Sequence, residues 1–373
     1  MKNYQNYESS HSKECKCMFL GVFDADGMVL ISVYSYLDDV ARNPDHKPYG
    51  IKIVYGLEQS RSKQDLVAKV ANFFEAESTI DSETGRATFR ANVNTEIGQK
   101  VRSLLLKNNP RHPGRYYDFL LSEKILALKN QNIEETKQGL VTLITLAYSN
   151  DASLRKKANE KKNKANNENS DNSKREIPIE VYYKAINPSK IELEEGKKTA
   201  EIIVNDLLNQ KQQLEEQLPE MEFSIDYVRG VHFGDGGFTI VLSVPKSYER
   251  LRFYPEWNIS GENLAYCQAF KNFFKKGKTN KSGNYERYIL SGMKPVESVY
   301  YVFENCWLPE YKKKQFEKIK HINSLLLDGY HLERAGAIHI VNMAYRISEK
   351  GKRSKSLEEL IEDVNSYFNK KKK

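Results

Sequence analysis

Apolar and polar residues recur along this chain in an order that occurs twice. In each copy an apolar helical stretch leads directly into an alternating strand, first at 29–34 and again at 238–243. Alternation with a period of two predicts a strand with one buried face, and recurrence every three to four residues predicts an amphipathic helix. Such a repeat predicts two copies of one structural unit.

Each copy continues with the same series of elements. In the first copy, strands are predicted at 50–55, 78–80 and 87–93, and helices at 62–75, 96–106, 116–129 and 133–149. In the second copy, strands are predicted at 237–244, 250–259, 276–281 and 285–290, and helices at 262–274, 295–306, 312–327, 332–347 and 357–368. The fold class that follows is α+β, with two pseudo-symmetric αββαββα units that each hold one curved antiparallel sheet.

Composition separates the two copies. Residues 155–176 are rich in Lys and Asn and carry no large apolar side chain, which is typical of a poorly ordered linker. A helix follows at 200–218, and we interpret it as a spacer or a partner-packing element. We therefore predict an N-terminal unit at 10–150, a basic, Asn-rich linker with this spacer helix at 151–222, and a C-terminal unit at 223–373.

Two nine-residue segments stand where the first helix of each copy meets the first strand: FLGVFDADG at 19–27 and VRGVHFGDG at 228–236. Gly21 and Gly230 remove side chains from one helix face, so two such helices can pack backbone to backbone. If they pair about a pseudo-two-fold axis, Asp26 and Asp235 lie side by side. Adjacent carboxylates repel unless cations lie between them, so the pattern predicts a site of hard oxygen ligands suited to Mg²⁺.

Charge and cysteine usage add modest limits. The chain has 373 residues and a net charge of +8, with 58 Lys and Arg against 50 Asp and Glu. This excess fits a polyanion partner, although an ordinary basic surface fits it equally well. We interpret the four cysteines as reduced thiols in a protein that is not secreted. The sequence has no apolar run of membrane-spanning length, so no membrane partner is expected.

The outward faces of the predicted strands carry polar and aromatic side chains. In the first copy these are Ser32, Tyr34, Tyr36, Lys52, Thr88, Arg90 and Asn92, and in the second copy Thr239, Ser243, Arg252, Tyr254, Asn258 and Arg287. A solvated sheet face would also be polar. Two such faces beside a pair of carboxylates instead favour a saddle for double-stranded DNA, with side chains that read base edges in the major groove.

These features together resemble the double-motif LAGLIDADG homing endonucleases, over about residues 17–149 and 223–348. Further agreement is found in YILSGMKP at 288–295, in Leu308-Pro309 before a lysine cluster, and in HPGRYYDF at 112–119. The resemblance implies a monomer whose two units join at the paired LAGLIDADG helices. It implies that the protein cuts both strands of a long DNA target, uses Mg²⁺ or another divalent cation, and starts the homing of its intron.

The resemblance also implies roles for particular residues. The final aspartate of each motif, Asp26 or Asp235, binds the metal, and the residue at position 25 is not used as a ligand. A polar residue at the end of the second strand positions solvent, which by spacing is Gln59, and its counterpart falls at Gly261. A basic residue near the base of the sheet supports the scissile phosphate; the residues that match are Lys312 or Lys313 in the second copy and, more loosely, Arg115 in the first. Phe233 stands where the family often has another aspartate, which is not the metal ligand.

An alternative from another class is an RNA-binding maturase that uses the same fold to help its host intron RNA. Retention of both aspartates favours the nuclease, and a DNA-binding regulator is disfavoured because it would not need them. The N-terminus is polar and carries Glu8 and Glu14, so it matches neither a signal peptide nor a transit peptide. We therefore expect a protein that is encoded in the organelle where it acts, a chloroplast or a mitochondrion.

Overall fold

The computed structural model describes residues 5–35, 49–82, 84–149, 178–243, 251–261, 263–282, 285–347 and 355–371. The chain divides into two compact units, named here after their β-sheets. The first-sheet unit comprises 26–59 and 67–217, and the second-sheet unit comprises 1–25, 60–66 and 218–373. The first motif helix therefore belongs to the unit of the second sheet, although the chain runs from it directly into the first sheet.

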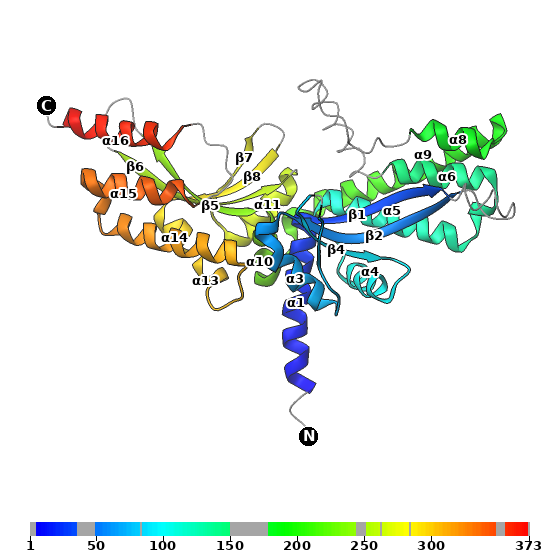
Figure 1. Cartoon of the computed structure of the whole chain (residues 1–373), viewed down its shortest axis with the longest axis horizontal. Helices are drawn as coiled ribbons and strands as arrows, with labels where there is room; N and C mark the ends of the chain where they lie inside the picture. Colours follow the sequence, from blue (N-terminus) through cyan, green and yellow to red (C-terminus); the bar gives the residue numbers. More distant parts are fainter. Residues whose placement is uncertain are drawn as a thin grey trace. The chain divides into compact units, whose positions relative to one another are not determined.

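The first sheet has four antiparallel strands in the order β1-β2-β4-β3 (Figure 1). They are β1 (Gly27–Ser35), β2 (Tyr49–Gln59), β3 (Thr79–Ile80) and β4 (Ala87–Asn92). β2 continues four residues past its predicted end at Tyr55, because its pairing with β4 runs on to Gln59 opposite Ala87. Val29 and Ile31 are buried, as the alternating pattern predicted.

The helices of the N-terminal half are α1 (Gln5–Asp26), α3 (Gln64–Phe73), α4 (Glu96–Asn108), α5 (Pro113–Asn130), α6 (Lys137–Tyr148), α8 (Ile179–Ile186) and α9 (Lys190–Gln217). α5 and α6 pack against β1, while α4 packs against β4 (Figure 1). The helix predicted from Ile133 begins instead at Lys137, because the Thr136 hydroxyl accepts a hydrogen bond from the Gly139 amide at 3.0 Å and caps the helix.

Helices α8 and α9 lie within the segment predicted as a linker. α8 has no counterpart among the predicted helices, and α9 begins ten residues before the predicted start at Ala200. α9 packs on α6 through Gly196, whose carbonyl accepts a hydrogen bond from the Thr142 hydroxyl at 3.1 Å. These two helices thus belong to the compact first-sheet unit, whereas the predicted Lys- and Asn-rich stretch at 155–176 lies outside the described residues.

The second sheet repeats the topology of the first, in the order β5-β6-β8-β7. Its strands are β5 (Gly236–Ser243), β6 (Arg252–Gly261), β7 (Lys278–Ser282) and β8 (Tyr285–Ser291). One face is lined by Phe238, Trp257, Tyr288 and Leu290, all of them buried. The equal strand orders confirm the predicted α+β class with two antiparallel sheets.

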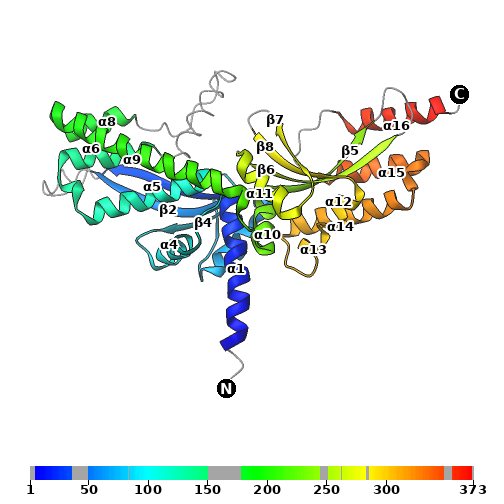
Figure 2. The same ribbon diagram turned by 180° about the vertical axis from the view of Figure 1, so that it is seen from behind.

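The helices of the C-terminal half are α10 (Ile225–Gly234), α11 (Leu264–Phe274), α12 (Met293–Glu297), α13 (Tyr300–Phe303), α14 (Glu310–Leu327), α15 (Arg334–Tyr345) and α16 (Leu357–Lys371). Figure 2 shows α12 beside α14, on which it packs. Among the residues that the structure describes, no helix combines the length and apolar character that crossing a bilayer requires.

One predicted helix of the C-terminal half was wrong. Residues 295–306 do not form a single helix but the short helices α12 and α13, separated at Ser298 and Val299. The Ser298 hydroxyl donates a hydrogen bond to the Pro295 carbonyl at 2.6 Å, and such bonds to the backbone compete with helix continuation. The apolar spacing alone could not indicate this break.

Candidate active site and nucleic-acid interface

Helices α1 and α10 cross where each has a glycine. A methyl carbon on Gly21 would lie 2.8 Å from the backbone nitrogen of Val231 and 3.0 Å from the Cα of Gly230. A methyl carbon on Gly230 would lie 2.8 Å from the backbone nitrogen of Val22 and 3.0 Å from the Cα of Gly21. The equal distances reveal a local pseudo-two-fold axis, and they confirm that the two motif helices pack backbone to backbone.

Asp235 stands at the C-terminal end of α10, immediately before β5. Its side chain is partly exposed, and its backbone amide donates to the Val231 carbonyl at 2.9 Å. Three side chains donate hydrogen bonds to backbone carbonyls around this residue: Tyr311 to Phe233, Lys63 to Gly234 at 3.4 Å, and Lys312 to Gly236. The carbonyl end of a helix carries partial negative charge, so two cations at this place are electrostatically favourable.

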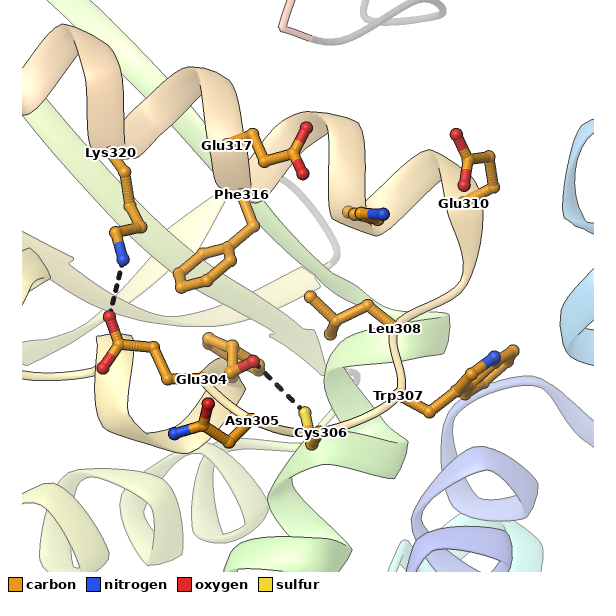
Figure 3. A pocket seen from close by; sticks show the side chains of 11 residues that line it. Glu304, Asn305, Cys306, Trp307, Leu308, Glu310, Phe316, Glu317 and Lys320 are labelled. Atoms are coloured by element: carbon orange, nitrogen blue, oxygen red, sulfur yellow. Dashed lines mark hydrogen bonds and ion pairs between the residues drawn. The ribbon is translucent and has the colours of Figure 1, made fainter.

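Lys312 and Lys313 occupy different surroundings, although nothing in the sequence pattern favoured either of them. Lys312 is buried, with 3% of its surface exposed. Lys313 is exposed and lines an open pocket of about 910 Å³ at the start of α14. Figure 3 shows Trp307 and Phe316 in this pocket, with the ion pair between Lys320 and Glu304 at its other end.

Lys63 is a component of the site that the sequence did not reveal. Its ammonium nitrogen lies 5.5 Å from the centre of the Tyr311 ring, and that of Lys312 lies 5.3 Å from the same ring. The neighbouring Asp65 accepts a hydrogen bond from the Glu310 amide at 2.6 Å, which fixes residues 60–66 on the start of α14. The only sequence signal was a basic residue four positions after Gln59.

His232 lies beneath this cluster and is almost fully buried. Its Nδ1 accepts a hydrogen bond from the Trp257 indole at 3.1 Å. Burial, and then the positive charge of Lys312, holds the pKa of His232 well below its usual value. The imidazole is therefore neutral at physiological pH, and it holds the end of α10 against the second sheet.

A buried hydrogen-bonded chain lies on one side of the α1–α10 crossing. The Tyr227 hydroxyl donates to Oδ2 of Asp24 at 2.7 Å, and the Tyr266 hydroxyl lies 2.9 Å from that of Tyr227. Burial, followed by the negative charge of Asp24, raises the pKa of Tyr227 well above its usual value. The tyrosine therefore keeps its proton and remains a donor to the carboxylate.

Asp26 and Gln59 belong to the first-sheet unit. Asp26 is partly exposed and is followed by Gly27, which pairs with Leu57 two residues before Gln59. In the second sheet Gly236 pairs with Ile259, two residues before Gly261. The two registers match, so Gly261 occupies the position that corresponds to Gln59. The roles of Asp26 and Gln59, and the side-by-side placement of Asp26 and Asp235, remain predictions.

The residue between the two aspartates of the first motif is Ala25. The alanine is 8% exposed, and its side chain is a methyl group that offers no oxygen to a cation. Position 25 therefore has no place among the metal ligands.

The described residues that were predicted on the outward face of the first sheet do lie on one side of it, and all but one are at least partly exposed. Strand pairing places Ser32 opposite Lys52, and Arg90 and Asn92 lie on the same side. The ring of Tyr34 covers Gly50 on this side, where a methyl carbon would meet it. Tyr36 lies outside the described residues.

Thr88 is the exception, because it does not offer a free polar group. It is 6% exposed, and its hydroxyl is hydrogen-bonded to that of Thr79 at 2.9 Å. Arg90 is exposed but held in place, since it pairs with Glu58 at 3.2 Å beside Arg86, which pairs with the same carboxylate at 2.7 Å.

The predicted outward face of the second sheet is a single surface. The strand registers place six of the predicted residues on one side of this sheet: Thr239, Ser243, Arg252, Tyr254, Asn258 and Arg287. Arg252 donates a hydrogen bond to the Tyr254 hydroxyl at 3.3 Å. This face thus offers guanidinium, amide and hydroxyl donors, which are the groups that read base edges.

The carboxylates suit a divalent cation that is completed by substrate. In the described part of the chain, no three His, Cys, Asp or Glu side chains gather as a metal site. Mg²⁺ commonly uses only one or two carboxylates, with waters and substrate phosphates as its other ligands. Asp235 and Asp26 are hard oxygen donors, partly exposed at the ends of their helices. Each therefore fits such a cation in its own unit.

Comparison with known proteins supports the fold. No family model matches the chain, and no curated protein sequence matches it either. The crystal structure of the I-LtrWI LAGLIDADG homing endonuclease bound to target DNA is similar over 91% of this chain and 99% of that chain, at 14% identity and a TM-score of 0.63. LAGLIDADG homing endonuclease I-GzeII in complex with DNA target is similar over 90% and 98%, at 14% identity and a TM-score of 0.60.

I-SmaMI bound to uncleaved DNA target in the presence of calcium ions is similar over 88% of this chain and 97% of that chain, at 14% identity and a TM-score of 0.59. These likenesses extend across both sheets of the chain. They confirm, at the level of the fold, the resemblance that was inferred from the two motifs.

Proposed function

We propose that this chain is a sequence-specific DNA endonuclease that cuts both strands of a long target and requires Mg²⁺ or another divalent cation. The cut starts the copying of its own intron into an intron-free allele. The observation that carries the proposal is the repeated junction of helix and sheet. A glycine-packed helix ends in Asp26 or Asp235 and leads directly into a sheet with a polar outward face.

Asp26 and Asp235 are the residues that would hold the cation. When bound, a divalent cation would supply the positive charge that activates water and stabilises the attacked phosphate. The two motifs would provide one carboxylate for the cut in each strand.

The basic residues around Asp235 position the phosphate. Lys312 fixes the first residue of β5 through its bond to Gly236, and Lys63 holds Gly234 on the other side of Asp235. Both lysines also contribute positive charge near a strongly anionic substrate. Because a phosphate carries no base identity, these residues act on the rate of cleavage rather than on the choice of target.

The outward faces of the two sheets determine which DNA sequence is bound. Arg252 and Asn258 of the second sheet, and Lys52 and Arg90 of the first, present donors at strand spacing on exposed surfaces. Phosphate contacts from the other basic residues would make binding strongly salt-dependent, because each contact releases counterions.

The test is selection of cleaved sites from a library that contains the coding genome and its intron-free junctions. The proposal expects one long site, cut on both strands with Mg²⁺ and uncut with EDTA. Binding to the host intron RNA that double-stranded DNA does not compete away, without any cleaved site, would instead support the maturase alternative.

A further inference from the structure

The crossing of α1 and α10 is symmetric in its backbone and asymmetric in its side chains. Tyr227 lies three residues before Gly230, and Asp24 lies three residues after Gly21. The pseudo-two-fold axis at the glycines makes Met18 the counterpart of Tyr227 and Phe233 the counterpart of Asp24. The crossing thus has a polar contact on one side and apolar residues at the matching positions on the other.

The polar side is buried and extends beyond the two helices. Asp24 and Tyr227 are each 1% exposed, and Tyr227 donates to the Asp24 carboxylate at 2.7 Å. Tyr266, the first buried residue of α11, continues the chain at 2.9 Å from Tyr227. The two residues of this polar chain that lie on the motif helices therefore both have apolar counterparts, Phe233 for Asp24 and Met18 for Tyr227.

This asymmetry makes the energy of pairing depend on which helices meet. If two copies of α1 paired, each Asp24 would be buried opposite Met18, which offers no hydrogen. If two copies of α10 paired, each Tyr227 hydroxyl would face Phe233 in place of the Asp24 carboxylate, and its bond to the Tyr266 hydroxyl would have to replace a bond to a charged acceptor. Both homotypic pairings would lose the bond between a hydroxyl and a carboxylate at a buried position, which is unfavourable, whereas in the observed pairing Tyr227 donates to Oδ2 of Asp24.

We propose that the Tyr227–Asp24 hydrogen bond is a pairing key, which makes α1 bind α10 of its own chain and reject a second copy of the same helix. The partner that this surface fits is therefore the other motif helix of the chain. A single buried polar contact that selects register and partner is a known device in paired helices. The proposal concerns assembly and does not depend on the nuclease activity.

The test compares full-length variants that differ only at the key. In the keyless variant, Asp24→Phe and Tyr227→Met give both helices the apolar pattern. In the mirrored variant, Met18→Tyr and Phe233→Asp are added, so that the key moves to the other side of the axis. Each protein is unfolded and refolded, and its molar mass is then measured by light scattering at concentrations up to about 1 mM. At such concentrations a motif helix of a second chain competes with the helix of the same chain for pairing.

We expect the wild type and the mirrored variant to refold as monomers, and the keyless variant to form a dimer whose fraction rises with concentration. A keyless variant that remains monomeric at every concentration would overturn the proposal. So would a folded mirrored variant that dimerises as much as the keyless one.

A second measurement covers the case in which these variants do not fold. Tyr227→Phe and Asp24→Leu, singly and together, form a double-mutant cycle by urea unfolding of the full chain. We expect each single change to lower the folding equilibrium constant about tenfold or more, and the second change to cost far less once the first is made. Additive effects would contradict a key at this position.

Discussion

Lys312 donates its side-chain hydrogen bond to the backbone carbonyl of Gly236, the residue that follows Asp235. This cation is almost fully buried, and burial of an ammonium group is costly unless nearby groups compensate. Here the Gly236 carbonyl, the Tyr311 ring and the negative end of α10 provide that compensation. Lys312 is therefore held as a buried cation at the residue next to Asp235, the candidate metal-binding carboxylate.

Replacement of Lys312 should therefore slow cleavage without changing the target. Lys312→Met keeps the aliphatic volume and removes the charge, and we expect the cleavage rate to fall by roughly 100-fold or more, as when a preorganised donor is removed. Lys313→Ala should reduce the rate far less, because Lys313 is exposed and lines the pocket of Figure 3. Lys320→Ala, on the same helix, controls for the loss of one positive charge. Equal reductions of the cleavage rate in all three variants would contradict the proposed role of Lys312 in cleavage.

The glycine crossing should tolerate no side chain. Gly21→Ala would place a methyl carbon 2.8 Å from the Val231 backbone nitrogen, and backbone cannot move aside as a flexible side chain can. We expect a loss of at least about 1–3 kcal/mol of unfolding free energy, the usual cost of overpacking. Gly237→Ala is the matched control, because its nearest neighbour would be Asn258 at 3.9 Å. Urea unfolding of both variants measures the difference.

The neutral, buried His232 should make stability fall as the pH falls. Its folded-state pKa is held well below the ordinary value, first by burial and then by the charge of Lys312. Below about pH 6.5 the unfolded chain binds a proton at this residue that the folded chain does not, so unfolding becomes easier by up to about 1.4 kcal/mol per pH unit.

The measurement is the unfolding free energy of the wild type and of His232→Gln between about pH 7.5 and pH 5.5, on either side of the ordinary histidine pKa. We expect the unfolding free energy of His232→Gln to fall less steeply with decreasing pH than that of the wild type. Some acid sensitivity should remain, because burial also lowers the pKa of His331. Identical slopes would show that His232 takes up its proton in the folded state.

The parts of this fold that depend on local pattern could be predicted from the sequence. Period-two alternation identified both sheets and the outward position of Arg252 and Arg90, because alternation is a property of neighbouring residues. The same reasoning failed where a hydrogen bond of a single side chain determines the local structure. It predicted one helix across Ser298, whereas the Ser298 hydroxyl bonds to the Pro295 carbonyl where α12 ends. It also could not show that the Thr88 hydroxyl is hydrogen-bonded to the Thr79 hydroxyl.

The parts of the site that depend on distant contacts could not be predicted. Lys63 reaches Gly234 across 171 residues of sequence, and Tyr227 reaches Asp24 across 203. The motif pattern marked where Asp26 and Asp235 stand, but it carries no information about which lysine is buried against Gly236. That distinction arises only when α14 packs on the start of β5.

The sheet faces should determine sequence preference residue by residue. Arg252→Ala and Arg90→Ala should each weaken the binding free energy for the target DNA by roughly 1–3 kcal/mol. Each should also relax the sequence preference at only a few base pairs. Thr88→Val should leave the preference unchanged, because this hydroxyl is buried against Thr79. Cleavage of every single-base variant of the target measures all three. An Arg252 variant that is weakened equally on all targets would mean that this residue contacts phosphate only.

The most direct test of the proposed function is cleavage of the selected target by the two aspartate variants. Asp26→Asn and Asp235→Asn each remove one hard ligand charge while they keep the shape of the side chain. In a plasmid that carries the target, we predict that the wild type with Mg²⁺ produces linear DNA. Each variant should bind the same duplex with nearly unchanged affinity and produce no linear DNA. Linearisation at the full rate by either variant, or by the wild type in EDTA, would contradict the account.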